Sequence, residues 1–231
     1  MRVVVTGANR GIGLELVRQL LARGDSVEAC VREPARATEL AALATETLRI
    51  HQVDVREPGT VTRLAETLGD LAVDVVINCA GVYGGPAQSL GQMADDLRLG
   101  DVAATYDINA MGPLRVAVAL LPHVRRGSGK KLVHVTSGMG SIEDNTSGGY
   151  YAYRMSKTAL NMMSRSLAVD LRSEGIISFV INPGWVQTDM GGARAPTPVA
   201  DSVRGILARI DAATLAESGE FLNWTGERYP W

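Results

Sequence analysis

The sequence has 231 residues, of which 46% are hydrophobic and 21% are charged, and this composition is typical of one compact globular domain with a sizeable core. Lysine and arginine number 23 against 25 acidic residues, so the net charge of -2 gives no electrostatic reason to expect nucleic acid as a partner. No apolar run approaches the roughly 20 residues of a membrane-spanning helix. A strand-like start at Met1 leaves no room for a signal peptide, so we expect a cytoplasmic protein.

Short β-branched segments alternate along the chain with longer segments of helical period, which is the pattern of parallel βαβ units. In chain order, strands are expected at 2–6, 26–31, 48–53, 74–78, 131–136 and 177–182. Helices are expected at 11–24, 60–68, 102–124, 151–173 and 198–210. The strands are apolar almost throughout, as are strands that helices cover on both faces.

These elements predict an α/β fold: a single Rossmann-like, doubly wound domain over residues 1–231, with a mostly parallel sheet flanked by helices. Ligands of such sheets bind at the carboxyl ends of the strands. Two segments rich in Gly, Ser, Thr and Pro, 138–149 and 184–198, follow strands at that edge, so we expect them to border the site.

The cysteines and histidines give no indication of a metal site. Cys30 and Cys79 lie in apolar, strand-like runs, which favours buried free thiols over a disulfide. The three histidines are scattered, and no spacing is typical of zinc ligation, so we expect no metal.

The segment TGANRGIG, residues 6–13, joins the first strand to the first helix. Glycines at this turn let the backbone approach a pyrophosphate, and a helix N-terminus directs free N–H groups at the anion. The spacing G-x3-G-x-G differs from the common G-x-G-x-x-G. A tight turn that merely needs small residues therefore stays an alternative.

Three motifs together resemble the short-chain dehydrogenase/reductase family over essentially the whole chain: TGxxxGIG, then Asn78-Cys79-Ala80-Gly81, then Tyr153-x-x-x-Lys157. Family members commonly carry Asn-Asn-Ala-Gly at the second motif, and we expect Cys79 to affect packing there rather than chemistry. The segments 140–161 and 221–231 further resemble the C-factor and sniffer branch, whose members include carbonyl reductases.

The end of the second strand indicates which dinucleotide binds. An NAD site usually offers a carboxylate there, whereas the 2'-phosphate of NADP demands cations. This sequence has Arg32 at that point, no acid until Glu33, and Arg10 in the glycine loop. Charge-assisted contacts from two guanidiniums favour NADP(H). The alternative is that Arg32 is a solvated loop charge.

The resemblance implies further cofactor contacts. Asp54 and Val55 match the position that contacts adenine, and the backbone of Val186 and the hydroxyl of Thr188 match the groups that orient the nicotinamide carboxamide. The full set implied for the cofactor is Gly7, Arg10, Gly11, Ile12, Gly13, Arg32, Asp54, Val55, Asn78, Ala80, Gly81, Tyr153, Lys157, Pro183, Gly184, Val186 and Thr188.

Tyr153 and Lys157 are four residues apart in a segment of helical character, so both project from one face. Hydride delivery to a carbonyl carbon leaves an alkoxide that needs a proton. A nearby ammonium and a cationic nicotinamide lower the pKa of a phenol, so we expect Lys157 to tune Tyr153 as the proton donor. An ordinary exposed pair on a helix is the alternative.

Two more positions match catalytic residues of the family. Ser137 follows the fifth strand and is expected to donate to the substrate oxygen, although Ser141 is a rival at a spacing closer to the usual one. Asn109 matches the residue whose side chain helps to hold a water that links the lysine to solvent.

The sequence thus predicts an NADPH-dependent reductase of aldehydes or ketones. The alternative is a nucleotide-binding regulatory or signalling protein of the C-factor kind with little turnover.

Met139, Trp185 and Met190 are candidate apolar walls for a carbonyl substrate. The aromatic end, with Trp224, Tyr229 and Trp231, could close the pocket, join a subunit contact or cap the core. The resemblance also implies a homodimer or homotetramer paired through the helices that contain Asn109 and Tyr153.

Overall fold

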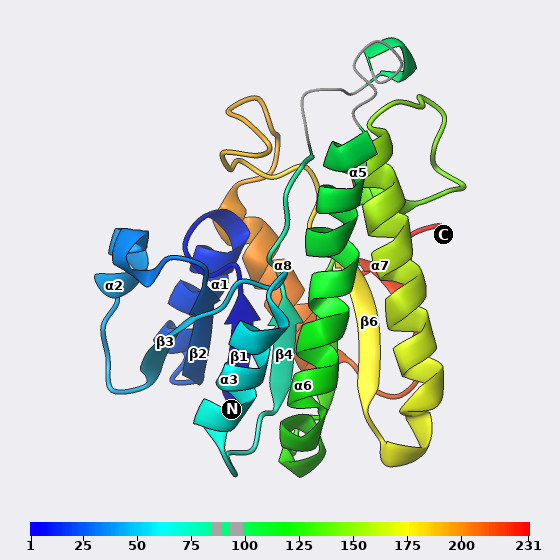
Figure 1. Cartoon of the computed structure of the whole chain (residues 1–231). Coiled ribbons are helices and arrows are strands. Elements are labelled where there is room, and N and C mark those ends of the chain that lie inside the picture. Colours follow the sequence, from blue (N-terminus) through cyan, green and yellow to red (C-terminus); the bar gives the residue numbers. More distant parts are fainter. Residues whose placement is uncertain (85–88, 93–98) are drawn as a thin grey trace.

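The computed structural model describes residues 1–84, 89–92 and 99–231. Its described strands form one seven-stranded sheet in the order β3-β2-β1-β4-β5-β6-β7, and every neighbouring pair is parallel (Figure 1). The strand order reverses between β1 and β4, which places the expected ligand crevice at the carboxyl ends of these two strands. The strands are β1 Arg2–Thr6, β2 Ser26–Val31, β3 Leu48–Gln52, β4 Val75–Asn78, β5 Lys131–Val135, β6 Ile177–Asn182 and β7 Phe221–Asn223.

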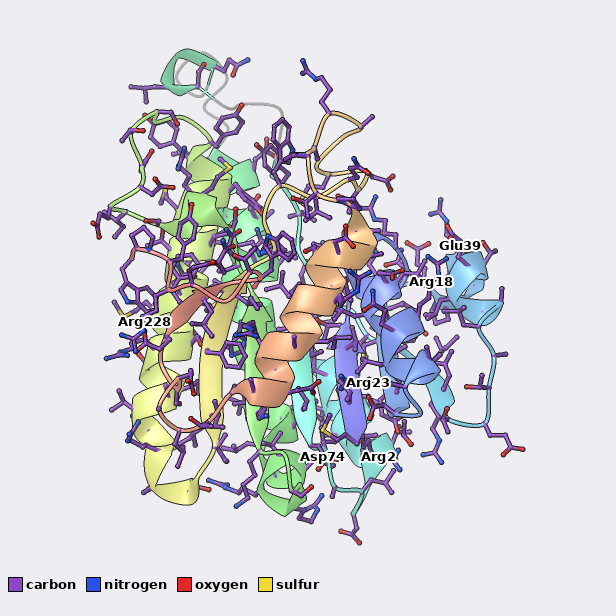
Figure 2. All side chains as sticks on the ribbon, turned by 180° about the vertical axis from the view of Figure 1, so that it is seen from behind. Arg2, Arg18, Arg23, Glu39, Asp74 and Arg228 are labelled. Carbon is purple, nitrogen blue, oxygen red and sulfur yellow. The ribbon has the colours of Figure 1, made fainter. Side chains whose placement is uncertain are left out.

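Helices cover both faces of the sheet. On the front lie α3 (Pro58–Leu68), α5 (Leu99–Tyr106), α6 (Gly112–Arg126) and α7 (Tyr151–Asp170), as Figure 1 shows. On the rear lie α1 (Gly11–Ala22) and α8 (Val199–Ala212), seen in Figure 2. A short helix, α2 (Thr38–Ala41), precedes β3. The Rossmann-like α/β fold expected from the sequence is confirmed.

The side-chain alternation of the central strands divides the apolar core between the two faces. Val3 and Val5 of β1 pack in one buried cluster with α1 and α8. Val4 points the other way and packs with residues of α3 and α6. Because successive side chains of a strand point to opposite faces, an apolar run through β1 fills both layers at once.

All six expected strands are present, with ends that differ by one residue at most. The sequence reading missed β7, the edge strand Phe221–Asn223. The single helix expected at 102–124 is instead α5, a π-helical turn at Asp107–Met111, and α6. Pro113 has no N–H with which to continue the regular ladder, so the helix widens just before it.

Both cysteines carry free thiols, Cys30 buried and Cys79 half-buried. Within the described part of the chain, none of the helices combines the length and the apolar character needed to cross a bilayer.

Candidate active site

A cavity of about 780 Å³ opens at the carboxyl edge of the sheet, and we call it the main cavity. Residues of the glycine loop, the ends of β5 and β6, the first turns of α7 and the segment after β6 line it. It therefore brings together sequence segments that lie more than half the chain apart. Among the lining residues are Tyr153, Lys157 and Ser137.

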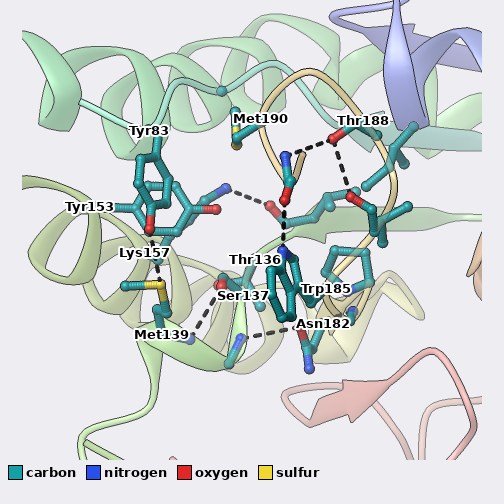
Figure 3. Close-up of a pocket in the computed structure, with 18 of the residues that line it drawn as sticks. Tyr83, Thr136, Ser137, Met139, Tyr153, Lys157, Asn182, Trp185, Thr188 and Met190 are labelled. Carbon is teal, nitrogen blue, oxygen red and sulfur yellow. Dashed lines mark hydrogen bonds between the residues drawn. The ribbon is translucent and has the colours of Figure 1, made fainter. Parts of the chain in front are cut away.

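Tyr153 and Lys157 both face the main cavity from the first turns of α7. Their side chains lie together, with the Lys157 Nζ atom 5.7 Å from the centre of the Tyr153 ring. The same Nζ donates a hydrogen bond to the backbone oxygen of Val135, at 2.8 Å. Figure 3 shows the phenol beside the lysine, with Tyr83 against its ring. The alternative of an exposed pair on a helix is excluded, because Tyr153 is 8% exposed and Lys157 is 5% exposed.

Burial dominates the ionisation of this pair. Burial raises the pKa of Tyr153, the neighbouring Ser137 hydroxyl offsets part of that rise, and the net pKa is about 12. Burial also lowers the pKa of Lys157 to about 8. Desolvation disfavours the charged form of both groups in the site formed by the protein alone, and the expectation that Lys157 together with an oxidised nicotinamide lowers the phenol pKa stays a prediction for the site with cofactor. The sequence gives no measure of that burial.

The two candidate serines after β5 have different surroundings. Ser137 lines the main cavity, and its oxygen accepts a hydrogen bond from the Met139 N–H at 3.2 Å. Ser141 is buried, donates to the carbonyl oxygen of Trp231 at 2.9 Å and accepts from the Asp144 N–H at 3.0 Å. Its hydroxyl is therefore committed away from the cavity, and the geometry favours Ser137 as the residue that meets a ligand.

Two glycines of the glycine loop are required because backbone atoms approach them closely. A Cβ atom at Gly13 would lie 2.1 Å from the backbone oxygen of Gly7, and one at Gly7 would lie 2.7 Å from the Cα of Ala80. These contacts support the reading that a tight turn needs small residues here. At Gly11 a Cβ atom would meet only the Thr188 side chain, at 3.3 Å, and Gly11, Ile12 and Gly13 all line the main cavity. The turn is therefore tight and also borders the cavity at the N-terminus of α1.

A second cavity of about 410 Å³ lies at the ends of β2 and β3, and we call it the arginine pocket after Arg10, Arg32, Arg36 and Arg56 in its lining. The expected residues Gly7, Asp54, Val55, Ala80 and Gly81 also line it.

The arginine pocket also contains two carboxylates. Glu33 pairs with Arg32 at 3.4 Å and with Arg36 at 3.2 Å. Asp54 pairs with Arg56 at 2.6 Å, which holds the pKa of that carboxyl below its ordinary value. Four guanidiniums against two carboxylates leave the lining with positive charge. Sequence reasoning missed Arg36 and Arg56, which follow the strand ends by several residues.

Arg10 lies between the two cavities. It lines both of them, and its guanidinium pairs with Asp189 at 3.1 Å. The segment after β6 thereby reaches the glycine loop. The expected cofactor residues of this segment, Pro183, Gly184, Val186 and Thr188, all line the main cavity.

Two expected site residues lie behind the cavities rather than in their lining. Asn78 is 2% exposed, and its Nδ2 lies 3.2 Å from Nδ1 of the buried His134. Asn109 is fully buried: it accepts from the Val82 N–H at 2.9 Å and donates to the Val82 oxygen at 2.8 Å and to Ser156 Oγ at 2.9 Å. Its amide thus fastens the segment after β4 to α7.

The expected wall residues Met139, Trp185 and Met190 all line the main cavity (Figure 3). Sequence reasoning missed Tyr83, whose ring centre lies 4.8 Å from that of Tyr153. The segment 138–149, which was expected to border the site, contributes Asp144, Thr146 and Ser147 to the lining, whereas Arg154 was missed.

The three aromatic residues near the end of the sequence, Trp224, Tyr229 and Trp231, have different surroundings. Trp224 packs against the core, Tyr229 lines the main cavity, and Trp231 is 42% exposed with its ring centre 5.5 Å from that of Phe221.

Comparisons with known proteins agree with this geometry. The family model described as short chain dehydrogenase matches residues 1–198. The C-signal protein of Myxococcus xanthus is 52% identical over 159 residues, covering 69% of this chain and 93% of that protein.

Solved structures are similar over the full length. The carbonyl reductase Sniffer of D. melanogaster superposes with a TM-score of 0.92 at 32% identity, covering 100% of this chain and 99% of that one. The NADPH-bound carbonyl reductase from chicken fatty liver gives 0.90 at 34% identity, covering 100% and 98%. The family resemblance seen in the motifs is confirmed, and the chain belongs to the short-chain dehydrogenase family of oxidoreductases.

Proposed function

We propose that this protein reduces the carbonyl group of an aldehyde or ketone to an alcohol, with NADPH as the hydride donor. The observation that carries the proposal is the single cavity lined by the glycine loop and by Tyr153, Lys157 and Ser137. A dinucleotide seated on the glycine loop would thus have a proton donor within the same cavity. Two similar structures are described as carbonyl reductases, one of them with NADPH bound.

The arginine pocket fits the 2'-phosphate that distinguishes NADP from NAD. Among the residues that the structure describes, Arg32 and Arg36 both pair with Glu33, so two guanidiniums share one carboxylate and part of their charge is left unbalanced. An Arg–phosphate contact is charge-assisted and bidentate, which makes it strong and specific. Asp54 and Val55 would border the adenine, and Val186 and Thr188 would orient the nicotinamide carboxamide.

When bound, NADPH supplies the hydride, and the side chains of this chain manage the proton. The Ser137 oxygen accepts the Met139 N–H, and its own proton, which lies beside the Tyr153 hydroxyl, would be donated to the substrate carbonyl oxygen when a substrate binds. The Tyr153 phenol, with a pKa of about 12, is protonated at neutral pH and is therefore a donor in the reductive direction. It passes its proton to the oxygen as negative charge develops there.

Lys157 then stabilises the phenolate that remains. Its ammonium lies beside the ring and is held there by the carbonyl of Val135. Opposite charge nearby favours the ionised phenol, and the charge of an oxidised nicotinamide, if bound here, would act in the same direction. Asn109 acts indirectly. Its amide fixes Val82 relative to α7, and this determines the shape of the cavity beside Lys157.

The identity of 52% to C-signal supports a second candidate, a regulatory protein that binds the dinucleotide with little turnover. Reduction ranks first because a buried acid and a buried amine in the cavity have no evident use in a sensor.

Consumption of NADPH, followed by its absorbance with a panel of quinones, isatin-like diketones and aldehydes, tests the proposal. We expect turnover by the wild type that is lost in Tyr153→Phe. Tight NADPH binding without turnover above background, unchanged in the variant, would overturn the proposal in favour of the sensor.

We further propose that residues 1–231 act as one cytoplasmic domain and assemble as a homodimer or homotetramer through the helical segments that contain Asn109 and Tyr153, namely the π-helical turn with its flanking α5 and α6, and α7. Light scattering of the purified protein at several concentrations tests the assembly, and a monomer throughout would refute it.

A further inference from the structure

The last residues of the chain fold back along the edge of the sheet. After β7 the chain turns, and Arg228 forms an antiparallel bridge with Leu222. The Tyr229 N–H donates to the Phe221 oxygen at 2.7 Å. We call residues 228–231 the strap; Figure 2 labels its first residue, and Figure 1 shows the red end of the chain emerging beside α7. The strap covers the edge strand and reaches toward the segment after β5.

That segment, residues 138–144, is called the serine loop because it directly follows Ser137. One atom of the strap, the carbonyl oxygen of Trp231, accepts three hydrogen bonds from it. The donors are the N–H groups of Ile142 and Glu143, both at 2.8 Å, and the Ser141 hydroxyl at 2.9 Å. The oxygen is therefore bound by two consecutive N–H groups and a hydroxyl, an arrangement typical of a specific binding site for an acceptor atom. The strap is therefore tied to the far end of the serine loop.

Tyr229 contacts both ends of the same loop. Its hydroxyl donates to Asp144 Oδ2 at 2.7 Å. Its phenol packs directly on Gly138, where a Cβ atom would lie 2.5 Å from the hydroxyl oxygen. The Gly138 N–H donates to Asn182 Oδ1 at 3.1 Å. The residue next to Ser137 thus contacts both Tyr229 and Asn182.

We propose that Tyr229 is a positioning residue for the carbonyl reduction: through Gly138 and Asp144, the strap fixes the serine loop and so keeps Ser137 aimed at the substrate oxygen. This inference rests on the proposed function. Tyr229 also lines the main cavity, so it acts at the border of the space a substrate would fill. Small displacements of an orienting group are costly, roughly 100-fold in rate for about 1 Å.

The test combines Tyr229→Ala and Tyr229→Phe with Ser137→Ala. Tyr229→Ala removes both the packing on Gly138 and the bond to Asp144, and we expect kcat to fall roughly 10-fold or more with the Kd of NADPH unchanged. Tyr229→Phe keeps the ring on Gly138 and should recover most of the rate. In the Ser137→Ala background, Tyr229→Ala should cost little more, because residues that act as a unit are not additive. Tyr106→Phe, at a 43% exposed tyrosine of α5, is the matched control and should leave kcat unchanged.

If the decrease in kcat of the double variant equals the product of the decreases in the two single variants, the inference is overturned, because Tyr229 would then act independently of Ser137. A second readout needs no turnover: hydrogen exchange of the Ile142 and Glu143 amides should accelerate in Tyr229→Ala. Unchanged exchange would refute the hold of the strap whatever the activity. Absence of turnover by the wild type with every carbonyl would instead count against the proposed function.

Discussion

Replacing Lys157 by methionine should stabilise the protein while removing its activity. The side chain is 5% exposed, and burial lowers its pKa from 10.5 to about 8. That difference, at about 1.36 kcal/mol for each unit of pKa, corresponds to about 3 kcal/mol of cost for keeping the ammonium in the folded state. Loss of the hydrogen bond to the Val135 oxygen lowers the free energy of unfolding by about 1 kcal/mol. We expect a net gain of about 2 kcal/mol in the free energy of unfolding at neutral pH.

The gain should depend on pH in a defined direction. Below pH 8 the lysine is protonated in both the folded and the unfolded protein, so the cost is fully present. As the pH rises from 8 toward 10.5, the unfolded chain keeps a proton that the folded one has lost, and the cost disappears. Urea denaturation of both proteins at neutral pH and near pH 10 should therefore show a shrinking advantage of Lys157→Met. A variant less stable than the wild type at neutral pH, or an advantage unaffected by pH, would refute the reasoning.

Three further predictions concern the cofactor and the core. Arg32→Ala should raise the KM for NADPH about 10-fold and leave that for NADH nearly unchanged in steady-state assays, because it removes a charge-assisted contact; equal effects would exclude a role in phosphate recognition. Gly13→Ala should abolish NADPH binding in a fluorescence titration, since its Cβ would meet the Gly7 oxygen at 2.1 Å, whereas Gly59→Ala, with open space around it, is the neutral control. Burial lowers the pKa of His134 to about 3, so wild-type stability should decline as the pH falls from 6.5 toward 3. His134→Gln should show a shallower decline in its urea midpoints, and identical slopes would contradict this.

The sequence predicted the central part of the fold because six strands are apolar enough to be covered on both faces. Their alternation with helical segments also predicted a parallel sheet. It did not predict β7, since three residues, Phe221–Asn223, carry no readable period. Nor did it predict the π-helical turn at Asp107–Met111, because a proline close to the start of a helix and a proline that ends one look alike in a sequence.

The motifs located many of the lining residues of both cavities, because the motif residues lie near strand ends that border the site. Tyr83 escaped detection, and Tyr229 was only one of three aromatic residues with a role left open, since only the folded chain brings these two to Tyr153 and to Gly138. The choice between Ser137 and Ser141 was open for the same reason. It depended on the Trp231 oxygen, which lies 90 residues further along the chain and takes the hydroxyl of Ser141.

The central claim is that the Tyr153 phenol delivers the proton that completes carbonyl reduction. Single-turnover measurement of NADPH oxidation in Tyr153→Phe, with the carbonyl that the wild type reduces fastest, tests it most directly. We predict a rate lowered roughly 100- to 10,000-fold, with the Kd of NADPH unchanged. A variant that retains a rate close to that of the wild type would contradict the account, because the proton would then come from another group.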